Sequence, residues 1–98
     1  MDIVKNINGS KLVISLSGRL DTTSAPVFEA EIKNSLAGVT ELVLDFEKLE
    51  YVSSAGLRVI LYARKQMNNQ GEMTLKNVCA DIMEVFEITG FTDILNFE

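Results

Sequence analysis

Alternating apolar and polar residues at the start of the chain predict a β-hairpin. Residues 3–7 carry apolar side chains in a first short strand, and Lys11–Ser17 alternates leucine or isoleucine with other residues, as half-buried strands do. Asn8-Gly9-Ser10 lies between these segments, and Asn-Gly between apolar segments is a strong indicator of a hairpin turn. The alternation ends at Gly18-Arg19-Leu20-Asp21.

The apolar spacing then changes to that of a helix. Phe28, Ile32 and Leu36 recur at intervals of four residues. Residues 22–26 precede them with hydroxyl side chains suited to an N-cap and with a proline suited to the first helical turn. We expect this helix to end at Gly38.

A strand and a second helix occupy the middle of the chain. Residues 42–46 form an apolar strand segment, and residues 48–51 read as a connection. The helix that follows begins at the serines of positions 53 and 54 and continues to about Asn68.

The last third of the chain predicts a strand, a helix and a final short strand. Residues 72–78 alternate as a strand does. Asp81 is suited to cap a third helix, and Gly90 lies just past its expected end. A closing strand is expected at residues 94–97.

The resulting order, β-β-α-β-α-β-α-β, defines the fold class. Strand–helix–strand units imply right-handed crossovers and parallel pairing, whereas the opening hairpin adds an antiparallel strand. We therefore predict an α/β fold in which residues 1–98 form a single domain. Its mostly parallel sheet should have about five strands, with about three helices mainly on one face.

Composition and charge limit the classes of partner. The 98 residues are 47% hydrophobic and carry a formal net charge of −5. Because contacts with nucleic-acid phosphates require clustered lysine and arginine, the scattered basic residues argue against a nucleic-acid interface. No apolar run approaches the roughly 18 residues of a membrane span, and the N-terminus lacks a signal-peptide core. These features and the lack of a basic cluster predict no membrane association. Cys79 is the single cysteine, so no internal disulfide is possible and a reducing cytoplasm is expected.

The residues that enzymes use most are missing. Without histidine there is no Ser-His-Asp or Cys-His arrangement and no imidazole ligand for zinc. One cysteine cannot build a thiolate cage, and neither common glycine-rich phosphate loop is present. The sequence therefore predicts a protein that is not an enzyme, with no cofactor and no metal site.

The most distinctive segment is Val52–Leu61, where two adjacent hydroxyls and a glycine lie between the apolar strand and the second helix. Unpaired N–H groups and the macrodipole at a helix N-terminus favour negative charge. Ser54 could therefore accept a phosphate, or it could simply cap the helix and stabilise it by about 1 kcal/mol. The local pattern leaves both interpretations open.

Two segments resemble a known family. Leu20-Asp21 before the first helix and Ser53-Ser54-Ala55-Gly56-Leu57 before the second resemble a STAS domain (sulphate transporter and anti-sigma factor antagonist). The resemblance covers nearly the whole chain, and stand-alone domains of this length resemble anti-sigma factor antagonists. In that family an anti-sigma factor, itself a serine kinase, phosphorylates a serine at the start of the second helix. The unphosphorylated antagonist binds this kinase and releases the sigma factor, and a PP2C-type phosphatase resets the system.

The resemblance also implies site residues. The family pattern is commonly Asp-Ser-Ser/Thr-Gly-Leu, and alignment on Gly56-Leu57 places the acceptor at Ser54. Ser53 then replaces the aspartate and is the alternative acceptor, while Ala55 replaces a hydroxyl residue. The implied partner-binding surface consists of Asp21, Thr22, Ser53, Ser54, Ala55, Gly56 and Arg58.

A second function also fits the resemblance. Some STAS domains dock on the ATPase of a lipid-transport system, in which case phosphorylation would be irrelevant. Neighbouring genes for a serine-kinase-like ATPase and a PP2C-type phosphatase would favour the antagonist function, whereas genes for transporter subunits would favour docking.

Overall fold

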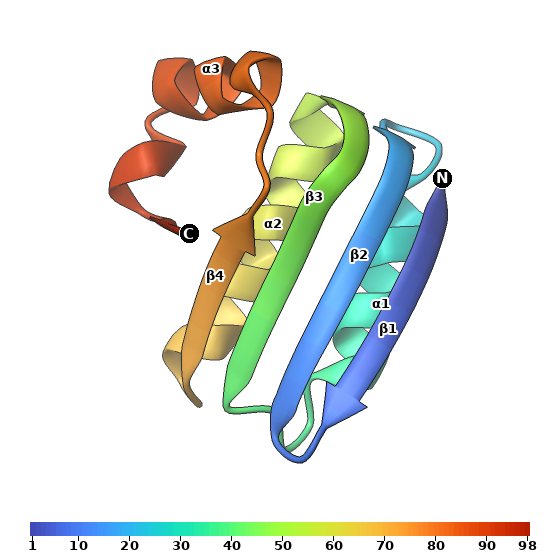
Figure 1. Ribbon diagram of the computed structural model, residues 1–98, viewed down its shortest axis with the longest axis vertical. Helices are drawn as coiled ribbons and strands as arrows, with labels where there is room; N and C mark the ends of the chain where they lie inside the picture. Colours follow the sequence, from blue (N-terminus) through green and yellow to red (C-terminus); the bar gives the residue numbers. More distant parts are fainter.

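The computed structural model describes all 98 residues, and the chain forms a five-stranded mixed sheet (Figure 1). Its strand order is β1-β2-β3-β4-β5; β1 pairs antiparallel with β2, and all other neighbours pair in parallel. This arrangement confirms the predicted α/β class with its antiparallel hairpin. The strands are β1 (Asp2–Asn8), β2 (Lys11–Leu20), β3 (Glu41–Val52), β4 (Glu72–Lys76) and β5 (Asn96–Phe97).

Three α-helices accompany the sheet. Helices α1 and α2 lie side by side behind β1 to β4 in Figure 1, while α3 lies at the upper end of the sheet, beyond β4. A short 3-10 helix, η1, follows α3 and leads to β5. The helices are α1 (Ala25–Ser35), α2 (Ser54–Asn68), α3 (Ala80–Thr89) and η1 (Phe91–Asp93).

The core lies between the sheet and the helices, as the alternating strands predict. In β2 the side chains of Leu12, Ile14 and Leu16 are buried, while their neighbours in sequence are at most half-buried. At the other end of the core, the ring of Phe86 in α3 lies 6.5 Å from the ring of Phe46 in β3. Burying each such large apolar side chain contributes about 1.5–3 kcal/mol, so this face of the sheet is firmly attached to its helices.

Strand β3 is longer than the sequence predicted. Residues 48–51 are part of the strand and not a connection, because Lys48–Val52 pairs with Ser17–Leu20 of β2. Two register shifts in this pairing mark β-bulges, which interrupt the alternation that sequence analysis relies on. As a consequence, β2 and β3 end side by side at the same edge of the sheet.

The helix caps differ from those expected. Ser24 is the N-cap of α1, but its side chain makes no capping hydrogen bond. Cys79, and not Asp81, is the N-cap of α3; Asp81 lies in the first turn. Gly90 does end α3, in a left-handed conformation with φ 80°. The final strand is shortened to two residues because the N–H groups of Ile94 and Leu95 donate to the carbonyl of Phe91, in the turn that ends η1.

Candidate functional site

The ends of β2 and β3 bring the two family-like segments together. The backbone N–H of Ser53, directly after β3, donates to the carbonyl of Leu20 at the end of β2 with an N···O distance of 2.8 Å. The loop after Leu20 leads into α1, and Ser53 leads into α2. The starts of both helices therefore lie next to each other at the carboxyl edge of the parallel strands, where open α/β sheets gather their functional residues.

The two serines have different environments. Ser53 is half-buried and is the N-cap of α2, since its Oγ accepts a hydrogen bond from the N–H of Gly56 at 3.3 Å. Ser54 is the first residue of α2 and is exposed, and its hydroxyl makes no hydrogen bond within the protein. The capping role that the sequence left open for Ser54 therefore belongs to Ser53. Ser54 carries the free hydroxyl.

Gly56 sets how closely α2 approaches the sheet. A Cβ atom at this position would lie 2.6 Å from Cγ and 3.1 Å from the carbonyl oxygen of Leu20. The 2.6 Å contact would force the neighbouring atoms to shift, so glycine lets the first turn of α2 rest on the end of β2 without displacing Leu20. Gly56 is buried, and it can influence a partner surface only by positioning the exposed residues around it.

Asp21 organises the loop between β2 and α1. Its Oδ1 accepts hydrogen bonds from the backbone N–H groups of Thr23 and Ser24, each at 3.1 Å. The Ser24 hydroxyl, instead of capping α1, donates to the carbonyl of Arg19 at 2.7 Å. The backbone hydrogen bond from Ser24 is the main cause that lowers the pKa of Asp21 below its ordinary value. The carboxylate is therefore ionised at neutral pH and helps to hold the loop.

A shallow hollow of about 430 Å³ lies between the starts of α1 and α2. Thr22 and Arg58 are exposed at its rim, and Ala55 is half-buried. Glu29 of α1 also lines it and forms an ion pair with Lys33 at 3.1 Å. The remaining lining residues are Ala25, Pro26 and Val59. Three of the seven residues that the resemblance implies line the hollow: Thr22, Ala55 and Arg58. The other four adjoin it through the Leu20–Ser53 hydrogen bond and the first turn of α2.

The sequence did not indicate the contact between Arg19 and Tyr51. The guanidinium of Arg19 lies over the ring of Tyr51, with its Cζ atom 4.1 Å from the ring centroid. These residues are register partners at the ends of β2 and β3, and the tyrosine remains 40% exposed. Their pairing became visible only with the bulged register, which no short-range pattern in the sequence indicates.

If Asp21 belongs to the partner surface that the resemblance implies, Asp21→Asn should weaken partner binding while preserving the fold. An asparagine Oδ1 can accept the same two backbone hydrogen bonds, so the loop should persist. If Asp21 contributes charge to the interface, the variant should also lose part of the salt dependence of binding. Titrations at low and high salt measure both effects. Unchanged affinity at both salt concentrations would remove Asp21 from the interface.

The same substitution should alter acid stability. Because the folded-state pKa of Asp21 is lowered, its carboxylate stabilises the fold above the ordinary value of 3.8, and this contribution is lost as pH falls through the folded-state pKa. Asp21→Asn should therefore lose less stability between neutral and strongly acidic pH, which urea unfolding at several pH values would reveal.

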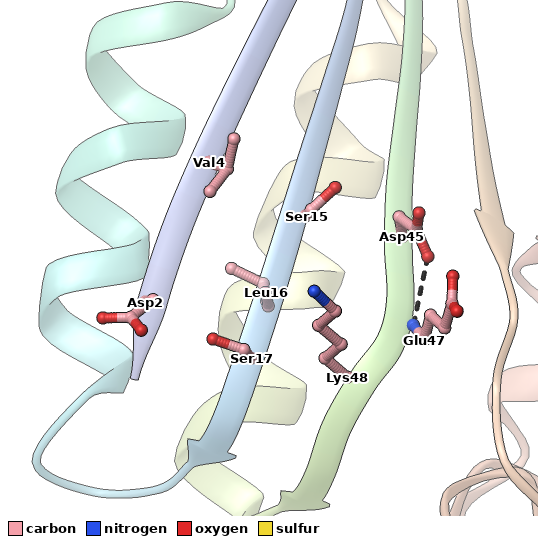
Figure 2. A pocket seen from close by; sticks show the side chains of 8 residues that line it. All are labelled: Asp2, Val4, Ser15, Leu16, Ser17, Asp45, Glu47 and Lys48. Carbon is pink, nitrogen blue, oxygen red and sulfur yellow. Dashed lines mark hydrogen bonds between the residues drawn. The ribbon is translucent and has the colours of Figure 1, made fainter.

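A second hollow, of about 420 Å³, lies on the sheet face opposite the helices (Figure 2). Here Asp45 accepts hydrogen bonds from Asn77 and from the N–H of Glu47, both at 3.0 Å. Burial raises the pKa of Asp45, but these bonds and nearby lysines outweigh burial and lower it overall. Figure 2 shows Lys48 extending toward β2 and the serines of that strand. Most residues that line this hollow are polar or charged, and the Asp45 carboxylate already accepts hydrogen bonds from the protein.

Two further features of the structure bear on its chemistry. No group of three cysteine, aspartate or glutamate side chains gathers closely enough to hold a metal ion. None of the helices has the length and apolar character needed to cross a bilayer.

The sequence model of the STAS domain matches residues 2–98. The chain belongs to the STAS domain family. Among its STAS relatives is BtrV of Bordetella bronchiseptica, named a candidate anti-sigma factor antagonist; it is 41% identical over 85 residues, which cover 85% of this chain and 73% of BtrV. The anti-sigma-B factor antagonist of Bacillus subtilis is 27% identical over 97 residues, covering 98% of this chain and 87% of that protein.

Solved structures share the STAS fold. The anti-sigma factor antagonist SpoIIAA in its unphosphorylated form superposes with a TM-score of 0.79 at 21% identity, covering 99% of this chain and 87% of SpoIIAA. The phosphorylated form of SpoIIAA from Bacillus gives a TM-score of 0.78 at 22% identity, covering 99% and 91% of the two chains. An anti-sigma factor antagonist from Mycobacterium paratuberculosis gives a TM-score of 0.89 at 20% identity, covering 98% of this chain and 83% of that one. At these identities the likeness concerns the fold alone.

Proposed function

We propose that this STAS protein is an anti-sigma factor antagonist. Unphosphorylated, it binds a cognate anti-sigma factor that is a serine kinase, and it thereby frees a sigma factor for transcription. Phosphorylation of Ser54 by that kinase releases the antagonist, and a PP2C-type phosphatase restores it. The protein acts in the cytoplasm as a binding partner and not as an enzyme.

The free hydroxyl of Ser54 carries this proposal. It is exposed at the first position of α2, whereas the neighbouring Ser53 hydroxyl is engaged as the helix cap. A kinase can reach Ser54 without disturbing a hydrogen bond of the fold. Relatives named as anti-sigma factor antagonists support the antagonist role.

The position also explains why a phosphate would act on binding and not on folding. Phosphate adds about −1.5 to −2 charges at neutral pH. The N-terminus of α2 accommodates negative charge, and the first turn contains no acidic residue that would repel it. The domain therefore stays folded, and the cost falls on the partner interface, where a dianion replaces a small neutral hydroxyl.

We predict that the cognate kinase and ATP add a single phosphate, at Ser54. Ser54→Ala should abolish labelling, whereas Ser53→Ala should retain most of it, because it removes a helix cap but leaves the acceptor in place. Mass spectrometry of the intact protein and of its digests measures both. A phosphate on Ser53 in the unsubstituted protein would contradict the assignment of the acceptor.

A further inference from the structure

We propose that Arg58 binds the phosphate of Ser54 within the same molecule. This inference rests on the proposed phosphorylation of Ser54 and adds a second element to the switch. The unphosphorylated protein presents the Arg58 guanidinium at the rim of the hollow between α1 and α2. After phosphorylation, an ion pair within α2 withdraws this cation from the partner surface.

The spacing of the two residues permits the pair. Ser54 and Arg58 are four residues apart in α2, and both are exposed. Side chains at this spacing lie above one another on one face of a helix, with Cβ atoms about 5–6 Å apart. The acidic group would be on the N-terminal side of the basic group, which is the more favourable order for an ion pair along a helix.

Arg58 has no competing partner in the folded domain. Its guanidinium forms none of the ion pairs of the structure. The nearby acid in the hollow, Glu29, is paired with Lys33 at 3.1 Å. The other two arginines are engaged: Arg19 lies over Tyr51, and the Nε of Arg64 donates to the carbonyl of Ile94 at 3.0 Å.

The charge of α2 also favours the ion pair between Arg58 and a phosphate on Ser54. The helix contains two arginines and a lysine but no aspartate or glutamate, although the whole chain has a net charge of −5. A phosphate at Ser54 therefore meets no acid along its own helix. A guanidinium can bind two phosphate oxygens at once, with charge-assisted hydrogen bonds that are stronger than those between neutral groups.

The test uses full-length protein in which phosphoserine is incorporated at position 54 during translation, so no kinase is needed. A phosphorus NMR titration then measures the second pKa of the phosphate. An ion pair favours the dianion, so this pKa should lie about 0.3 lower in the protein with Arg58 than in R58Q. R58K should give an intermediate value, because an ammonium attracts the dianion but cannot form the bidentate pair.

K65Q is the matched control. It removes the same charge from an exposed position of α2 that lies about 16 Å along the helix axis from Ser54, and it should leave the phosphate pKa unchanged. Equal pKa values in R58Q and the unsubstituted phosphoprotein would overturn the proposal, as would an equal shift in K65Q. A failure of the kinase to label Ser54 would instead refute the proposed function and would leave this measurement unaffected.

Discussion

Phosphorylation of Ser54 is expected to weaken binding of the anti-sigma factor kinase by about a hundredfold or more. In the proposed function the partner's contact surface fits the start of α2, where the unmodified Ser54 side chain is small and neutral. A phosphate there is either repelled or must lose its water on binding, and a penalty of a few kcal/mol gives this loss of affinity. Calorimetric titration of the phosphorylated and unphosphorylated protein against the kinase measures the ratio directly.

Ser54→Asp provides a graded version of the same experiment. One carboxylate charge replaces nearly two, so affinity should fall less than with phosphate. Aspartate suits the first turn of a helix, so thermal stability should be equal or slightly higher. Ser54→Ala, which adds no charge, is the control and should bind as the unsubstituted protein does. A melting temperature lowered by many degrees in Ser54→Asp would contradict the exposed placement of this side chain.

The sequence predicted the arrangement of elements because local patterns determine them. The Asn8-Gly9 turn and the alternation in β2 are short-range features, and both appear in the structure as expected. The second helix ends at Asn68, as its apolar spacing and the polar segment after it predicted. Each of these elements buries one face, so the spacing of apolar residues in the sequence matches the repeat of the strand or helix that they form.

Features that depend on register were not predictable in the same way. The extension of β3 through residues 48–52 requires pairing with the end of β2, and the bulges that permit it leave no regular alternation. The Arg19–Tyr51 contact follows from that register. Likewise, Ser24 satisfies the carbonyl of Arg19 in place of a helix N–H, because the loop folds back against β2.

The candidate site was predictable only in outline. The sequence identified the two serines at a helix start and left open whether Ser54 is a phosphate acceptor or the helix cap. The backbone settles their geometry: Ser53 is extended, with ψ 174°, and directs its Oγ to the N–H of Gly56, while Ser54 is already helical. A difference of one residue in where the helix begins thus decides which hydroxyl is free.

Gly56→Ala is expected to destabilise the fold by about 1–2 kcal/mol, because overpacking costs about 1–3 kcal/mol and the helix propensity of alanine returns at most about 1. The added methyl group would lie 2.6 and 2.9 Å from Cγ and Cδ2 of Leu20, a fully buried side chain with no room to move. Urea unfolding measures the change, with Ser54→Ala as a control that alters the same turn without crowding it.

A double-mutant cycle identifies the cause of that loss. Leu20→Ala alone should cost about 2–5 kcal/mol, since it leaves a cavity in the core. It also removes Cγ and Cδ2, the two atoms nearest to the new methyl group, and leaves only the carbonyl oxygen at 3.1 Å. Gly56→Ala should therefore cost much less in the Leu20→Ala background than in the unsubstituted protein. Equal costs in both backgrounds would show that the close approach of α2 to the end of β2 is not what requires glycine. The expected coupling would instead show that the contact between Gly56 and Leu20 positions the start of α2, and with it Ser54. These two residues belong to the two segments that resemble the STAS family.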